Sequence, residues 1–182
     1  MTDGLRHSKP FRRSSYLLAT DATDLRILAE LVRNGKASFV DIGKKLNLHP
    51  NVVAYRINKM EQMGIIREYT VILDLEKLGV SEQVYVGGSF PEHSERDQVM
   101  EQIAAIPQTV QVVSSLGSPE GMIFLVGKNK ADVDKVISKL RNLNMRIEYT
   151  ASIIKTYEKG QLGNFLELLA DEIQNPQETN SQ

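Results

Sequence analysis

The sequence predicts an α+β protein in which a helical N-terminal part precedes a larger part that alternates strands and helices. Two patterns support this prediction. Capping residues precede apolar side chains at helical spacing in residues 20–66, and strand-like runs alternate with capped helical segments in residues 82–156. A third observation, the distribution of charge, divides the chain at about the same place. With 182 residues, the chain has room for two small domains, or for one domain and a small module.

Three short helices account for residues 20–66. Asp21 caps the first helix, with Asp24 in the reciprocal capping position. Ser38 and Asp41 repeat this signature at the second helix, and the third opens at Pro50, a residue tolerated in a first helical turn. Because a tight turn joins the second and third helices, these residues are expected to form a helix-turn-helix unit.

The third predicted helix has two contrasting faces. Val53, Ile57 and Met60 cluster within about 60° around the helix and form its buried seam. The opposite face carries amides and a tyrosine that can contact base edges, with lysines nearby that can reach phosphates. The candidate DNA contacts are Lys44, Lys45, Asn51, Tyr55, Asn58, Lys59 and Gln62. A plain solvated face is the alternative, and Arg56 is expected to pair with Glu61 or another carboxylate rather than to read a base.

The charge of the chain is polarised. Residues 1–64 carry 11 Lys+Arg against 6 Asp+Glu, whereas residues 65–182 carry 11 against 17. A basic arm, residues 1–19, precedes the first helix, with no acid between Arg6 and Asp21. This balance favours contact between the first part and nucleic acid. A chance imbalance between two solvated surfaces, and an arm that only adds solubility, remain the alternatives.

Residues 82–160 follow the order βαββαβ. Strands are expected over residues 83–90, 110–116, 122–128 and 146–156. Ser94 with Asp97 caps a helix through Ala105, and Asn129 with Asp132 caps a second helix. This order is typical of the split βαβ form, an antiparallel four-stranded sheet with two helices on one face.

Two further segments flank this part. Residues 67–75 alternate apolar and polar side chains, which predicts a linker strand after the helical unit. Near the C-terminus, apolar residues recur at helical spacing and predict an amphipathic helix that packs on the body or on a partner. These residues are Leu162, Phe165, Leu166, Leu169 and Ile173.

Several classes of protein are disfavoured by composition. The chain has no cysteine and three scattered histidines, and it lacks the spacing of a phosphate loop or a dinucleotide fingerprint, so we expect no enzyme activity, cofactor or metal. Its longest apolar run is five residues, Met122 to Val126, so no membrane segment or secretory signal is expected and a cytoplasmic location follows. An RNA-binding sheet would need aromatics on its third strand, which offers only Phe124.

Several motifs in the helix-turn-helix region, together with the βαββαβ order, resemble those of a known protein family. Asp41-Ile-Gly-Lys-Lys-Leu-Asn-Leu, then Pro50, Arg56-Ile, Met60-Glu and Gly64-Ile-Ile, ahead of a βαββαβ module, are similar to the Lrp/AsnC (feast/famine) transcription regulators. The resemblance implies a winged helix-turn-helix, a hinge strand, and a ferredoxin-like (RAM-type) domain that forms dimers and then tetramers or octamers. His49 stands where the family usually has serine before the proline.

The resemblance also implies a site for a free amino acid between dimers. The family usually places glycine and acidic residues in the turn between the second and third strands, and the matching stretch here is Gly117-Ser-Pro-Glu-Gly121. Ser118 and Pro119 depart from that pattern. The candidate effector-binding residues are Gly117, Ser118, Glu120, Gly121, Thr150 and Ser152. A plain β-turn is the alternative, because glycine and proline also mark ordinary turns.

Together these features divide the chain into an arm (1–19), a helix-turn-helix domain (20–66), a hinge strand or linker (67–81), an effector-binding and oligomerisation domain (82–160), and a C-terminal helix with a polar tail (161–182). The expected function is that of an oligomeric, sequence-specific DNA-binding transcription regulator, modulated by an amino acid. Its partners are double-stranded DNA, further copies of the chain and the amino acid. The alternative is an architectural DNA-binding protein without an effector.

Overall fold

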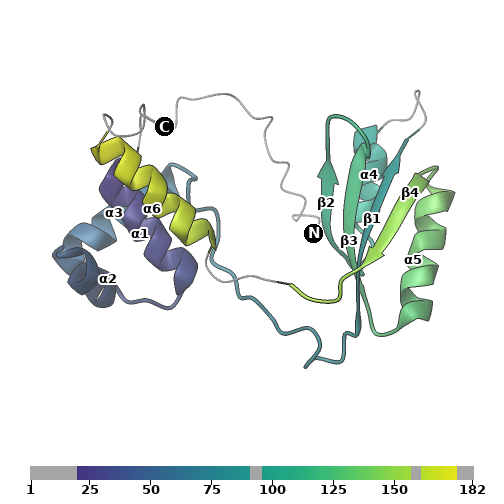
Figure 1. Cartoon of the computed structure of the whole chain (residues 1–182), viewed down its shortest axis with the longest axis horizontal. Helices are drawn as coiled ribbons and strands as arrows, with labels where there is room; N and C mark the ends of the chain where they lie inside the picture. Colours follow the sequence, from purple (N-terminus) through teal and green to yellow (C-terminus); the bar gives the residue numbers. More distant parts are fainter. Residues whose placement is uncertain (1–19, 91–95, 157–160, 176–182) are drawn as a thin grey trace. The chain divides into compact units, whose positions relative to one another are not determined.

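The computed structural model describes residues 20–90, 96–156 and 161–175, and divides them into two compact units (Figure 1). One unit contains residues 73–156 and holds an antiparallel sheet. The other contains the helices of residues 20–72 together with the C-terminal helix. Among the described residues, we find no helix with the length and apolar character that a membrane span requires.

The three helices predicted in residues 20–66 are present as α1 (Ala22–Arg33), α2 (Phe39–Leu46) and α3 (Pro50–Gln62). Asp21 and Asp24 form a reciprocal capping box, since each carboxylate accepts a bond from the backbone N–H of the other. The Ser38 hydroxyl accepts from the backbone N–H of Asp41 at 3.1 Å. The start signals predicted for α1 and α2 are therefore confirmed.

A small core and a tight turn hold the helix-turn-helix together. The core joins all three helices through Ile27, Ile42, Val53, Ile57 and Met60. In the turn, Asn47 has a φ of 55°, a left-handed conformation that asparagine tolerates better than most residues. A Cβ added to Gly43 would lie 2.6 Å from the carbonyl oxygen of Leu48. Glycine is therefore required where α2 approaches the start of α3.

The C-terminal helix, α6 (Gln161–Gln174), packs on α1 (Figure 1). Leu166, Leu169 and Ala170 of α6 pack against Ala22, Leu25 and Leu28 of α1. Arg26 of α1 also lies 2.8 Å from Asp171 of α6. The amphipathic helix expected near the C-terminus is confirmed, and it packs on the helical unit of its own chain.

The predicted βαββαβ order is confirmed in the second unit. The strands are β1 (Glu82–Ser89), β2 (Thr109–Ser114), β3 (Gly121–Gly127) and β4 (Arg146–Ser152), and the helices are α4 (Arg96–Ala104) and α5 (Lys130–Asn142). The sheet order is β2-β3-β1-β4 with every neighbouring pair antiparallel. This is the α+β, ferredoxin-like arrangement that the sequence predicts.

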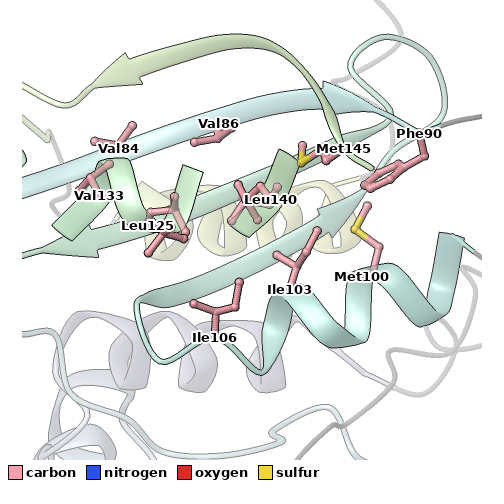
Figure 2. Close-up of a cluster of buried hydrophobic side chains, with 12 residues drawn as sticks. Val84, Val86, Phe90, Met100, Ile103, Ile106, Leu125, Val133, Leu140 and Met145 are labelled. Carbon is pink, nitrogen blue, oxygen red and sulfur yellow. The ribbon is translucent and has the colours of Figure 1, made fainter. Parts of the chain in front are cut away.

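Helices α4 and α5 cover one face of the sheet. Val84, Val86 and Leu125 of the strands share one core with Ile103 of α4 and Leu140 of α5 (Figure 2). Side chains on the opposite face alternate with these. There Tyr85 stacks on Phe124 with ring centroids 5.0 Å apart, and Tyr85 is 41% exposed. The helices thus leave an apolar face of the sheet uncovered.

The structure corrects three details of the sequence prediction. The linker strand expected over residues 67–75 is absent, because residues 67–74 pair with no strand of the described chain, and Val71 and Ile72 are exposed. Strand β2 ends at Ser114 and β4 at Ser152, both earlier than predicted. The predicted cap Ser94 and the arm of residues 1–19 lie outside the described residues.

Candidate nucleic-acid interface and ligand loop

Helix α3 separates a buried seam from an exposed polar face, as its sequence predicts. Val53, Ile57 and Met60 are at most 2% exposed, whereas Tyr55 is 68% exposed. The exposed side chains on the opposite face are Asn51, Asn58, Lys59 and Gln62. Within the described part of the chain, none of the five polar side chains on this face makes a hydrogen bond or ion pair. Their donors and acceptors are available to base edges and phosphates.

The position of α3 depends on Arg56. Its guanidinium donates to Asp21 and to Asp24 at 2.7 Å each, and so ties α3 to the first turn of α1. Burial acts to raise the pKa of Asp21, but the bonds from Arg56 and from the backbone N–H of Asp24 outweigh it and lower that pKa. The prediction that Arg56 pairs with a carboxylate is confirmed, although Glu61 instead accepts a bond from Tyr69 at 2.7 Å.

His49 caps α3 in place of the serine usual in the family. Its Nδ1 accepts a hydrogen bond from the backbone N–H of Asn51 at 3.2 Å, and Pro50 occupies the first helical turn. One of the unsatisfied N–H groups at the helix start is therefore bonded. The departure from serine changes the capping group and leaves the helix start in place.

The two lysines predicted at the end of α2 differ in their surroundings. Lys44 is exposed and has no bonded partner in the described part of the chain. Lys45 is also exposed, but its Nζ lies 2.5 Å from a carboxylate oxygen of Glu30 on α1. Among the described residues, Lys45 is the only one of the seven predicted DNA contacts whose side chain forms an ion pair.

The predicted ligand loop lies between β2 and β3. Gly117 has a φ of 113°, a conformation that favours glycine. The Ser118 hydroxyl donates to Glu148 of β4 at 2.8 Å. Glu120 lies 2.8 Å from Arg96 of α4 and also accepts from the backbone N–H of Phe90 at 3.1 Å. The polar side chains of the loop are thus bonded within the protein.

The charge of Glu120 is stabilised by its partners. The hydrogen bond from Arg96, followed by the one from the backbone N–H of Phe90, lowers the pKa of Glu120 below its ordinary value. Glu120 therefore holds a carboxylate at neutral pH, as an acceptor for an ammonium group requires.

The remaining predicted ligand residues are only partly brought together. Gly121 begins β3 and pairs with Gly88 of β1. Thr150 pairs with Val86, which lies two residues before Gly88 in β1. Ser152 pairs with Val84, which lies four residues before Gly88 in the same strand. At about 3.3 Å per residue, Ser152 lies about 13 Å along the sheet from the row of Gly121. Along the strands, Thr150 therefore lies nearer to the row of Gly121 than Ser152 does.

Sequence reasoning missed two residues that contact this loop, Arg96 and Glu148. The register of β1 and β4 shifts between Gly87 and Gly88, which makes Glu148 the extra residue of a bulge. A bulge can redirect a side chain, and its position is not visible in a two-residue repeat. Arg96 stands in the first turn of α4, and only the folded sheet brings it to Glu120. No group of His, Asp and Glu side chains among the described residues could hold a metal ion.

Comparison with known sequences places both units in one family. Residues 20–67 match the family model described as winged helix-turn-helix DNA-binding. An HTH-type transcriptional regulator of Pyrococcus furiosus is 31% identical over 126 residues, covering 68% of this chain and 84% of the relative. The regulatory protein AsnC of Haemophilus influenzae is 22% identical, with 74% of this chain and 89% of the relative covered.

Solved structures share the fold. The B. subtilis protein LrpC matches with a TM-score of 0.68 and 24% identity, over 76% of this chain and 97% of that one. A Neisseria meningitidis transcriptional regulator, solved as a complex with L-Met, matches with a TM-score of 0.69 and 19% identity, over 76% and 92%. Since the sequence similarity to the Pyrococcus furiosus regulator and to AsnC covers more than two thirds of this chain, the chain belongs to the Lrp/AsnC family of DNA-binding transcriptional regulators.

Proposed function

We propose that the protein is an oligomeric regulator that recognises a specific DNA sequence through the exposed face of α3 and responds to a free amino acid. The observation that carries the proposal is the face that contains Asn51, Tyr55 and Asn58. Its polar side chains lie exposed on the recognition helix without a bonded partner among the described residues. An α-helix fits the major groove, where amide side chains can read base edges. Lys44, Lys45, Lys59 and Gln62 complete the proposed contact set.

Substitution on this face tests the recognition step. An operator is first selected from random genomic fragments. Tyr55→Ala and Asn51→Ala are then each expected to reduce discrimination between operator and random DNA by about 1–3 kcal/mol, because base contacts are lost. Both side chains are exposed, so the thermal unfolding midpoint is expected to stay near that of the original protein. If both variants keep the original ratio of affinities at fixed salt, this face is not the reader.

A charge-matched pair separates base reading from phosphate contact. Lys59→Ala is expected to weaken binding to operator and random DNA equally, and to reduce the salt dependence by about one phosphate contact. Lys139→Ala removes the same charge from an exposed position on α5, and is expected to leave the salt dependence unchanged. Equal effects of the two variants would show that net charge alone governs binding.

The uncovered face of the sheet supports assembly of several copies. Tyr85 and Phe124 stack there, and an apolar face of this kind is uncommon on a monomer. A dimer also matches the two-fold symmetry of a typical operator, and further association would give a tetramer or octamer. Light scattering that gives one chain mass, 20.4 kDa, at micromolar concentration would rule out assembly. Phe124→Glu is expected to dissociate the assembly.

The loop between β2 and β3, with Thr150, is the proposed amino-acid site. The complex of the Neisseria regulator with L-Met, which shares this fold, supports a ligand of this class. Glu120 is the proposed acceptor for the ammonium, and N–H groups around Gly117 and Gly121 the donors to the carboxylate. Calorimetry with a panel of amino acids is expected to find a binder, which Glu120→Ala weakens about tenfold.

One observation favours the second candidate, an architectural DNA-binding protein without an effector. Glu120 is already bonded to Arg96 and to the backbone of Phe90, so a ligand must replace an existing partner. The two functions differ in a direct measurement. The effector-responsive regulator gives saturable heat with at least one amino acid, and the architectural protein gives none with any of them.

We propose that the boundaries between the parts of the chain fall after residues 19, 66, 81 and 160. The proposal places the protein in the cytoplasm, where DNA and free amino acids are both available to such a regulator. The names of the relatives as transcriptional regulators support regulation rather than catalysis. An activity screen that found turnover dependent on residues of the loop would contradict this part of the proposal.

A further inference from the structure

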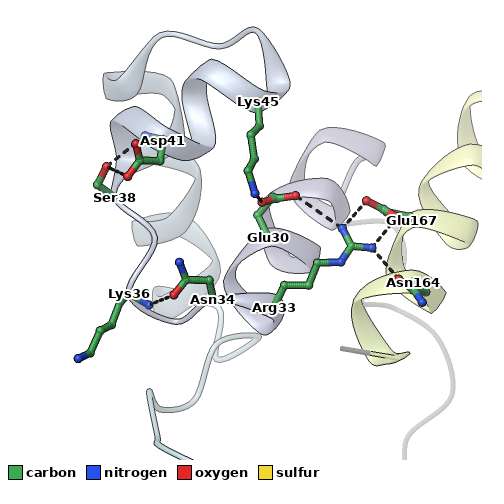
Figure 3. Close-up of polar contacts among 9 residues, drawn as sticks. All are labelled: Glu30, Arg33, Asn34, Lys36, Ser38, Asp41, Lys45, Asn164 and Glu167. Atoms are coloured by element: carbon green, nitrogen blue, oxygen red, sulfur yellow. Dashed lines mark hydrogen bonds and ion pairs between the residues drawn. The ribbon is translucent and has the colours of Figure 1, made fainter. Parts of the chain in front are cut away.

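Charged side chains connect the C-terminal helix to Lys45 in the last turn of α2 (Figure 3). Lys45 Nζ lies 2.5 Å from Glu30 Oε2, and the other oxygen of Glu30 lies 3.6 Å from Arg33 Nη1. On its far side, Arg33 donates to both oxygens of Glu167 on α6, at 2.5 and 2.7 Å. It also donates to Asn164 Oδ1 at 2.7 Å. The four charges form one continuous series across three helices.

Glu30 stands between two cations and is bonded closely to one of them. Its side chain is 11% exposed, so its interactions are less screened by water than those of a surface acid. Arg33 is held in a two-point bond by Glu167, a strong geometry for a guanidinium and a carboxylate. Arg33 therefore lies farther from Glu30, at 3.6 Å, than Lys45 does at 2.5 Å, and Lys45 is the closer partner of Glu30.

The attachment of α6 keeps this arrangement in place. A Cβ added to Gly163 would lie 3.1 Å from the backbone oxygen of Ala29 and 3.2 Å from Arg33 Cγ, so α6 comes close to α1 beside this arginine. Asp171 makes a second ion pair with Arg26 further along. The hydrogen bond from Arg33 lowers the pKa of Glu167, which keeps this acid ionised at neutral pH.

We infer that Glu167 is a positioning residue that limits DNA binding by keeping Lys45 paired with Glu30. With Glu167 in place, Arg33 is occupied and Glu30 holds the ammonium of Lys45. When Glu167 is removed, or α6 leaves α1, Arg33 turns to Glu30 and competes with Lys45. The released ammonium can then contact a DNA phosphate. This inference rests on the proposed function, in which Lys45 contacts DNA.

The test compares three variants of the full chain that each remove one negative charge from α6. Glu167→Gln removes the partner of Arg33. Asp171→Asn breaks the other ion pair to α1, and Glu172→Gln changes an acid that has no ion-pair partner in the described part of the chain. Binding to a random duplex is measured by anisotropy over a series of salt concentrations. Circular dichroism checks that helix content is retained.

Glu167→Gln is expected to raise the affinity for DNA about two- to fivefold more than either control at low salt, with a steeper salt dependence. The gain is expected to disappear when Lys45→Ala is added, and also when Arg33→Gln is added. Loss of the affinity gain on addition of Arg33→Gln is the result specific to this inference, because without Arg33 no cation competes with Lys45 for Glu30.

Two results would overturn the inference. One is an equal gain in all three variants, which would mean that net charge or release of the helix is sufficient. The other is a gain in Glu167→Gln that persists without Lys45. In the Glu167→Gln background, where Lys45 is released, an unchanged salt dependence on addition of Lys45→Ala would mean that the proposed contact of Lys45 with DNA fails as well. The effects of Tyr55→Ala and Asn51→Ala on specificity then decide whether the rest of the proposed function stands.

Discussion

The two candidate binding surfaces of this protein differ in how their polar groups are used. On α3, the side chains of Asn51, Tyr55 and Asn58 are exposed and make no bond to any described residue. In the loop between β2 and β3, Ser118 and Glu120 are both bonded to other parts of the same unit. The helix can accept a partner as it stands, whereas the loop must exchange partners.

The two surfaces therefore draw their binding free energy from different sources. A surface whose groups are bonded only to water exchanges those bonds for bonds to a ligand, at a net gain of about 0.5–1.5 kcal/mol for each bond. A loop that gives up an internal ion pair gains only the difference between the two bonds. Recognition of DNA is therefore expected to depend on how firmly α3 is held, and effector binding on the strength of the bond between Arg96 and Glu120.

The largest effect is expected from Ile57→Ala, which removes support from beneath the proposed reading face of α3, the face of Asn51, Tyr55 and Asn58. Ile57 is 2% exposed in the small core of the helical unit, and truncation of such a side chain lowers the free energy of unfolding by about 2–5 kcal/mol. Amide hydrogen exchange of α3 measures this loss, while the amides of β1 and β3 act as the internal control. Equal losses in both units would contradict the separation of the two surfaces.

Arg56→Gln is expected to have the next largest effect. It leaves Asp24, whose side chain is 3% exposed, without its cation, and is expected to lower stability by about 1–3 kcal/mol. The lowered pKa of Asp21 adds a pH dependence: its contribution is present above the ordinary value of 3.8 and is lost as pH falls through the lowered value. Acid unfolding of the helical unit should therefore lose part of its pH dependence in this variant. If the acid unfolding transition of Arg56→Gln is the same as that of the original protein, the Asp21 carboxylate does not contribute to this pH dependence.

Most of the helical unit could be predicted because its signals are local. The caps at Asp21 and Ser38, the Val53–Met60 seam and the polar face of α3 each depend on residues within one helix. The order βαββαβ is also visible in the sequence, since each strand and helix has its own period. These features need no information about which distant residues meet.

The details that could not be predicted depend on contacts between distant residues. Arg96 reaches Glu120 only when α4 packs on the sheet, and a bulge in β4 makes Glu148 a partner of Ser118. The ion pair between Arg33 and Glu167 joins residues 134 positions apart. The prediction of a linker strand was wrong because an alternating pattern does not show whether a strand has a neighbour to pair with.

Arg96→Gln tests the exchange of partners in the loop. If Glu120 accepts the ammonium of the effector, removal of the competing guanidinium is expected to raise the affinity for the amino acid about threefold. Calorimetry with the amino acid found in the panel measures this change, with Lys135→Gln on α5 as a control of equal charge. A fall in affinity would instead mean that Arg96 holds the carboxylate of the ligand.

The smallest effect is expected at the start of α3, where His49→Ser restores the residue usual in the family. The Nδ1 of His49 accepts from Asn51 N–H at 3.2 Å, which is long for a capping bond. A serine hydroxyl is among the preferred caps, so the variant is expected to gain about 0.5 kcal/mol of stability, whereas His49→Ala should lose a similar amount. Thermal unfolding of the full chain measures both. Since the cap lies outside the proposed reading face, neither variant is expected to change the ratio of affinities for operator and random DNA. A change in that ratio with unchanged stability would mean that His49 itself contacts DNA.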